Sequence, residues 1–107
     1  MKEIKAVIRT NKLIALREAL MNVPGFSGMT VARIEECAMP KQHVASHTIA
    51  EEVTEFVPKL HIEIVTSPEY ADAIFECILQ TTKTGHHDDG LVWMTDVERS
   101  EFVFKAK

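Results

Sequence analysis

Two stretches of the chain, residues 2–9 and 56–66, alternate between apolar and polar residues. In the second stretch, Leu60, Ile62 and Ile64 share one side of an extended chain, with polar residues between them. A period of two is typical of a β-strand with one buried side. The sequence therefore predicts strands over both stretches. Further strands are expected at residues 29–37 and 91–97, and residues 102–104 could add a short one.

Two other stretches place apolar residues three or four positions apart. The stripe over residues 13–23 predicts a first helix, which Thr10 or Asn11 can cap. The stripe over residues 68–83 predicts a second helix, with the hydroxyl of Ser67 as its cap.

The expected order is strand-helix-strand, a long loop, and strand-helix-strand again. Right-handed crossovers then place both helices on one face of a four-stranded antiparallel sheet. This is the ferredoxin-like βαββαβ fold of the α+β class, in a single domain over residues 1–107. Two helices cannot cover both faces of a sheet, so we expect a homotrimer that buries an apolar sheet face. The residues assigned to that apolar face are Ile4, Ile8, Leu60, Ile62 and Ile64.

Residues 38–55 lack a sustained apolar period and are expected to form a long loop. A loop of this length in a small domain is usually functional. It offers few large apolar groups whose burial could offset the entropy lost on ordering. We therefore expect it to become ordered when it binds a partner.

Composition narrows the classes of function. The 107 residues carry a formal net charge of −4 with no basic block, which argues against binding nucleic acid. No apolar run is long enough to span a bilayer, so we expect no membrane insertion. The N-terminus has no signal-peptide pattern, and Cys37 and Cys77 form no Cys-x-x-Cys pair, which favours a cytoplasmic protein. No set of nucleophile, base and orienting residue is recognisable, so we expect no enzymatic activity.

The stretch TGHHDDGLVW, residues 84–93, carries the most distinctive chemistry. Glycines allow backbone N–H groups to approach a phosphate closely, and an aspartate before a glycine can shape the turn through its side chain. Imidazole and carboxylate groups also suit zinc, copper, nickel or cobalt. A phosphate site, a metal site and an ordinary polar turn therefore all remain open. The candidate metal ligands are His43, His47, His86 and His87.

Several segments together resemble the PII signal-transduction family. They are ALREALMNV (15–23), GMTV (28–31), FVPKLHIEIV (56–65) and TKTG with DG (82–85 and 89–90). The resemblance implies a trimer that binds an adenine nucleotide in each cleft between subunits. It also implies that the long loop, here residues 38–55, docks onto a membrane transporter or a regulated enzyme.

Individual positions match the family's nucleotide cleft. They are Thr30, Val65, Thr84, Gly85, Asp89 and Gly90. His86 stands where the family has a lysine, and a protonated histidine would supply a cation there. Lys59 matches the family's lysine for 2-oxoglutarate, which is held there through ATP-bound magnesium and a loop glutamine.

Other positions depart from the family pattern. Leu91 replaces another lysine, and Phe102 and Phe104 replace two arginines. Losing these cations should weaken nucleotide binding, so ADP or AMP is as plausible a ligand as ATP. At the base of the loop ECAM (36–39) replaces a glycine-rich run, while Pro40 replaces the metal-binding glutamine and Glu52 a modifiable tyrosine.

These departures keep one alternative function open. Some divergent PII-like relatives are associated with heavy-metal efflux. The alternative is a metal-handling trimer that uses the loop and turn histidines.

Overall fold

The computed structural model describes residues 1–37 and 56–104, in which the order of elements is strand, helix, two strands, helix, strand. The expected loop at 38–55 lies outside the described residues, as do His43, His47, Pro40 and Glu52. The strands are β1 (Lys2–Arg9), β2 (Thr30–Cys37), β3 (Phe56–Thr66) and β4 (Gly90–Asp96). The helices are α1 (Leu13–Leu20) and α3 (Pro68–Thr82), and a 3₁₀ turn at Thr10–Lys12 leads into α1.

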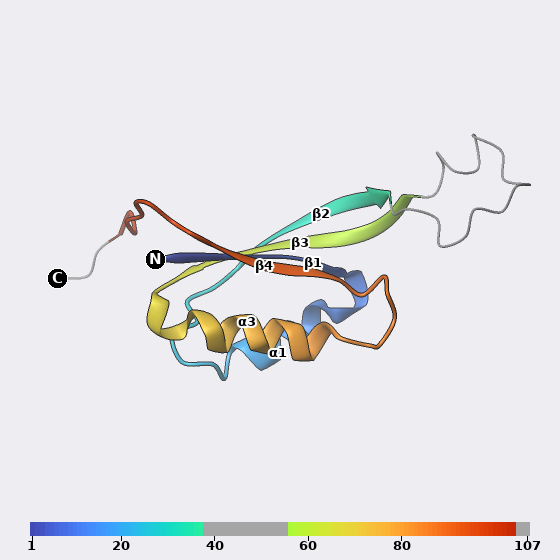
Figure 1. Ribbon diagram of the computed structural model, residues 1–107, viewed down its shortest axis with the longest axis horizontal. Helices are drawn as coiled ribbons and strands as arrows, with labels where there is room; N and C mark the ends of the chain where they lie inside the picture. Colours follow the sequence, from blue (N-terminus) through green and yellow to red (C-terminus); the bar gives the residue numbers. More distant parts are fainter. Residues whose placement is uncertain (38–55, 105–107) are drawn as a thin grey trace, which may run out of the picture.

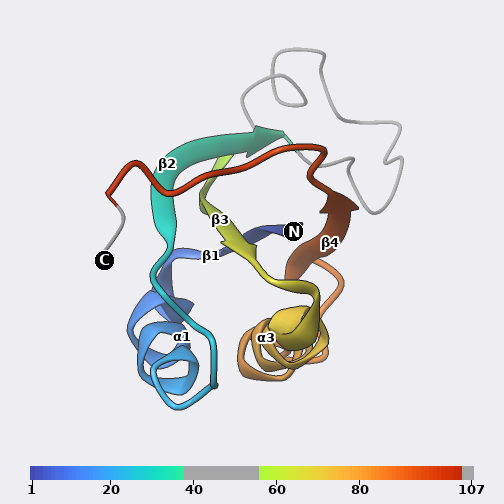
Figure 2. The ribbon, with the colours of Figure 1, turned by 90° about the vertical axis from the view of Figure 1, so that its left-hand side faces the viewer.

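The strands form one sheet in the order β2-β3-β1-β4, and every neighbouring pair is antiparallel. Both helices lie beneath this sheet (Figure 1). Viewed along the strands, they lie side by side under the same face (Figure 2). This arrangement confirms the predicted ferredoxin-like fold.

The face of the sheet that the helices cover forms the hydrophobic core. Apolar side chains from alternate positions of β1 and β3 meet the apolar stripes of α1 and α3, and each is at most 2% exposed. The sheet contributes Ile4, Ala6, Ile8, Leu60, Ile62 and Ile64, and the helices contribute Leu16, Leu20, Ala71, Ile74 and Ile78.

The assignment of Ile4, Ile8, Leu60, Ile62 and Ile64 to a face buried between subunits is therefore wrong. The chain's own helices already cover these side chains. A period of two shows which residues share a face, but it does not show which face the helices will cover.

The opposite face of the sheet, called here the open face, has a mixed composition. We define it by Lys5, Arg9, Thr30, Lys59, His61, Glu63, Val65 and Trp93, which the strand register places on one side. The rings of His61 and Trp93 stack with their centroids 6.2 Å apart. Residues 97–104 leave β4 and cross this side of the sheet at the end where β1 begins (Figure 2).

Three local predictions are wrong. Residues 102–104 do not form a strand. Thr10 and Asn11 do not cap α1, because both belong to the 3₁₀ turn and Lys12 is the residue before the helix. Ser67 precedes α3 as expected, but its side chain makes no capping hydrogen bond.

No helix within the described ranges is long and apolar enough to cross a membrane.

Candidate functional site

The turn from Thr84 to Gly90 connects α3 to β4 and is organised by one carboxylate. Asp89 accepts hydrogen bonds from the N–H groups of Thr84 (2.7 Å) and Gly85 (3.0 Å), and also from the Thr84 hydroxyl. The hydroxyl and the N–H of Thr84 hold the pKa of Asp89 well below its usual value, with smaller contributions from Gly85 and from the charge of Arg9. The Asp89 N–H closes the turn by donating to the carbonyl of His86 at 3.2 Å. The expectation that this aspartate shapes the turn through its side chain agrees with these contacts.

The two glycines of the turn are required by its backbone geometry. Gly85 has a φ of +89° and Gly90 a φ of +122°, which side chains rarely allow. A Cβ atom on Gly90 would lie 1.9 Å from the carbonyl oxygen of Val7. Gly90 therefore permits β4 to start directly against β1, and this contact fixes the position of the turn.

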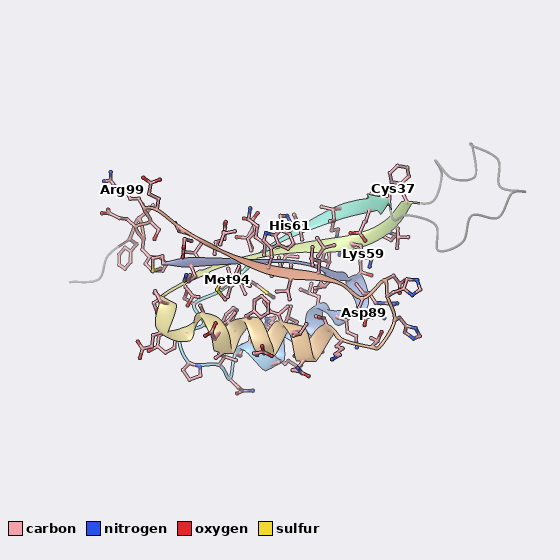
Figure 3. All side chains as sticks on the ribbon, viewed as in Figure 1. Cys37, Lys59, His61, Asp89, Met94 and Arg99 are labelled. Atoms are coloured by element: carbon pink, nitrogen blue, oxygen red, sulfur yellow. The ribbon has the colours of Figure 1, made fainter. Side chains whose placement is uncertain are left out.

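Two cations from neighbouring strands face this turn. Lys59 on β3 is only 3% exposed and donates a hydrogen bond to the carbonyl of Asp88. Its Nζ also lies 3.8 Å from Oε1 of Glu36 on β2. Figure 3 shows Lys59 and Asp89 at the same end of the sheet. Lys59, which the family resemblance predicts to bind the effector, thus already contacts the Asp88 carbonyl and Glu36 within the chain.

Arg9 is the second cation, and it is not among the site residues predicted from the sequence. Its Nη2 pairs with Oδ1 of Asp88, and its Nε lies 3.3 Å from Oδ1 of Asp89. Arg9 is the cross-strand partner of Lys59, so both residues end up beside the turn. The sequence does show an arginine at the end of a predicted strand. Placing this arginine beside Lys59 and the turn, however, requires the pairing register of the two strands.

Thr30 and Val65 lie at the other end of the open face. Thr30 pairs with Glu63, and Val65 pairs with Glu3 near the start of β1. Val65 lies six positions after Lys59 on β3, which is roughly 20 Å along an extended strand. Within one chain, the predicted nucleotide residues therefore fall into two separate groups.

The positions where family cations are missing also divide between these two ends. Leu91, 65% exposed, follows the turn. Phe102, 64% exposed, lines a depression of about 340 Å³ with Met1 and Val65 at the far end, and Phe104 follows it at 84% exposed. Exposed apolar side chains thus stand at both ends of the open face.

The predicted metal ligands do not form a metal site within the described residues. His86 and His87 are exposed on the turn. In residues 1–37 and 56–104 no group of three or more His, Cys, Asp or Glu side chains is placed to hold a metal ion. Since His43 and His47 lie outside these ranges, the metal-handling alternative stays a prediction.

The described residues form an α+β domain with one open sheet face and a turn flanked by two cations, and such a fold alone does not determine function. Comparison with known proteins identifies the family. The family model described as "Nitrogen regulatory protein P-II" matches residues 1–106. The nitrogen regulatory protein P-II of Pasteurella multocida (strain Pm70) is 39% identical over 99 residues, which cover 92% of this chain and 88% of that protein. The nitrogen regulatory protein P-II 1 of Escherichia coli (strain K12) is 38% identical, with the same coverage of both chains.

The chain belongs to the nitrogen regulatory protein P-II family. Proteins of this family are trimeric regulators of signal transduction, and they bind adenine nucleotides and act on partner enzymes and transporters. The family resemblance drawn from the sequence is thus confirmed, and with it the regulatory class of function.

Proposed function

We propose that this chain forms a homotrimeric regulator, built from one domain per chain, that binds an adenine nucleotide between subunits. The supporting observation is the separation of the candidate residues on the open face. Thr30 and Val65 lie at one end, whereas the turn Thr84–Gly90 lies at the other, together with Arg9 and Lys59. A ligand the size of a nucleotide can contact both groups only if two chains bring opposite ends together.

The composition of the open face supports burial against other copies of the chain. Its aromatic pair, His61 and Trp93, lies among Lys5, Glu3 and Glu63, so the face combines apolar area with charges of both signs. Interfaces between subunits commonly combine aromatic anchors with polar groups in this way. A trimer that packs through this face leaves the helices outside.

The turn is suited to bind phosphate weakly. Asp89 already occupies the N–H groups of Thr84 and Gly85. The N–H groups of His86 and His87 make no hydrogen bond within the described residues, so they remain available to an anion. With Leu91, Phe102 and Phe104 in place of cations, fewer charge-assisted bonds can form, and we propose that ADP or AMP competes effectively with ATP.

We further propose that residues 38–55 transmit the bound state to a membrane transporter or a regulated enzyme in the cytoplasm. This segment connects the end of β2, where Glu36 lies, to the start of β3, where Lys59 lies. One of the three N–H donors of Lys59 is given to the carbonyl of Asp88, so a 2-oxo acid effector bound at Lys59 would contact a group already attached to the turn. Binding an effector at Lys59 would therefore affect both the turn and the strand ends next to residues 38–55.

Calorimetry and light scattering test the proposal directly. The purified protein is titrated with ATP, ADP, AMP and salts of zinc, copper, nickel and cobalt, and its molar mass is measured at micromolar concentration. We expect a trimer of about three times 12.1 kDa with one nucleotide site per chain. A monomer, or a trimer that binds none of the nucleotides, contradicts the proposal, and selective binding of a metal favours the alternative function.

The role of His86 has its own test. If the imidazole of His86 contacts phosphate, His86→Ala should weaken nucleotide binding measured by calorimetry at one fixed pH. His87→Ala is the matched control. A nucleotide affinity that His86→Ala leaves unchanged excludes this contact.

A further inference from the structure

Two adjacent aspartates in the turn have different roles. Asp89 holds the turn together through two N–H groups and a hydroxyl, and its side chain is 19% exposed. The Asp88 side chain is 47% exposed, and its carboxylate pairs with Arg9. The carboxylate of Asp88 takes no part in the hydrogen bonds that Asp89 makes within the turn.

Arg9 has a fixed backbone and a partly accessible head group. It is the last residue of β1, which is paired on both sides, and its side chain is 29% exposed. A guanidinium group offers five donors in a planar fork that matches phosphate as well as carboxylate. The N–H groups of His86 and His87 lie in the same turn and make no hydrogen bond within the described part of the chain.

We propose that Arg9 is the cation that receives the phosphate groups of an anionic ligand at this turn, and that Asp88 holds Arg9 until the ligand replaces it. The inference rests on the proposed function and identifies the cation that the same site uses. Arg9 is not among the positions of this chain that match the family's nucleotide cleft in the sequence.

The exchange is physically reasonable because one anion replaces another. Arg9 stays paired throughout, so no buried charge is left without a partner. The Asp88 carboxylate is half-exposed, so its ion pair with Arg9 contributes little free energy and water can replace Arg9 there. Asp89 remains in place, and its Oδ1 lies 3.3 Å from Nε of Arg9 without a hydrogen bond, so Asp89 attracts Arg9 to the turn by charge alone. Asp88 therefore acts as a competitor that lowers the apparent affinity for phosphate.

Four variants test this exchange in the full chain. Asp88→Asn removes the competing charge and leaves Arg9 in place, whereas Arg9→Ala removes the cation and Arg9→Lys keeps its charge without the fork. Arg17→Ala is the matched control, because Arg17 is an exposed arginine on α1. Each protein is titrated by calorimetry with inorganic tripolyphosphate and with ATP at one fixed ionic strength, and thermal unfolding checks that each is folded.

Tripolyphosphate and ATP should respond in the same way. We expect Asp88→Asn to bind both about threefold to tenfold more tightly than the wild type, and Arg9→Ala about tenfold or more weakly. Arg9→Lys should fall between the wild type and Arg9→Ala, and Arg17→Ala should match the wild type. If Arg9→Ala fails to fold, the increase in Asp88→Asn decides the question alone.

Failure of this inference is distinguishable from failure of the proposed function. If ATP binds and neither Asp88→Asn nor Arg9→Ala changes its affinity, the role of Arg9 is wrong but the nucleotide function stands. If tripolyphosphate follows the expected pattern and ATP binds no better, Arg9 is the anion-binding cation but the adenine specificity is wrong. If neither probe binds to any variant, both proposals are wrong.

Discussion

The two faces of the sheet differ in what covers them: the chain's own helices cover one face, and the other keeps exposed area. On the covered face, side chains such as Ile4, Ile62 and Ile64 pack against the chain's own helices and are almost fully buried. On the open face, Trp93, His61 and Val65 retain exposed area beside charged groups. Figure 3 shows Met94 between the sheet and the helices, and His61 on the opposite side.

This difference separates folding from function. The covered face supplies most of the apolar burial within one chain, so it should determine the stability of the domain. The open face carries the cations, the turn and the aromatic pair, so changes there should act on assembly and ligand binding. Three substitutions test this separation, from the largest expected effect to the smallest.

The covered face is tested most directly by Ile62→Ala. Ile62 is 0% exposed and lies on β3, a central strand of the sheet. Losing a buried isoleucine side chain leaves a cavity and should lower the free energy of unfolding by about 2–5 kcal/mol. Chemical denaturation at a fixed protein concentration measures the change. Val57→Ala, on the same strand but 45% exposed, should cost less than about 1 kcal/mol.

The open face is tested by Trp93→Ala. If this face is the subunit interface, removing the indole should weaken association by about 2 kcal/mol or more while the isolated chain stays folded. Sedimentation velocity over a range of concentrations should then detect smaller species that the wild type lacks. Ile14→Ala removes an exposed apolar side chain from α1 and should leave the assembly unchanged. An unchanged assembly in Trp93→Ala would exclude this face as the main contact.

The turn at one end of the open face is tested by Asp89→Asn through its pH dependence. Because the folded-state pKa of Asp89 is lowered, its charged form stabilises the fold above the unfolded-state pKa of about 3.9, and this stabilisation is lost as the pH falls below that value. Asp89→Asn should therefore unfold at a lower temperature than the wild type at pH 7, by less than Ile62→Ala does.

The difference between Asp89→Asn and the wild type should shrink as the pH falls below about 4. Asp96→Asn provides the control, because Lys2 also lowers the pKa of Asp96 although its side chain is 82% exposed. Solvent screening should make its effect on the unfolding temperature too small to measure. A difference for Asp89→Asn that stays constant down to pH 2 would show that its charge does not stabilise the turn.

Much of the fold could be predicted from local patterns. Alternation in β1 and β3, the apolar stripe of α3 and the Pro68 start all lie within short windows, and the structure has strands and a helix there. The errors arose where a local signal had to compete with its surroundings. Thr10 and Asn11 are good capping residues, yet the chain enters α1 through a 3₁₀ turn that includes both of them.

The candidate site was only partly predictable. The motif TGHHDDG marks the turn, and the Asp-Gly pair indicates how the turn is shaped. Arg9 could not be assigned, because it lies 79 positions before Asp88 along the chain. The strand register brings them together, since Ile8 pairs with both Leu60 and Gly90.

By itself the sequence determined the order of strands and helices, the family, and the chemical groups of the turn. These properties depend on residue type and short spacing, which are readable along the chain. The tertiary structure decided which sheet face the helices cover, that Thr30 and Val65 lie far from the turn, and that Arg9 and Lys59 face it. Those outcomes depend on register and crossover between distant segments, because a strand's two sides become inside and outside only when the helices pack against one of them.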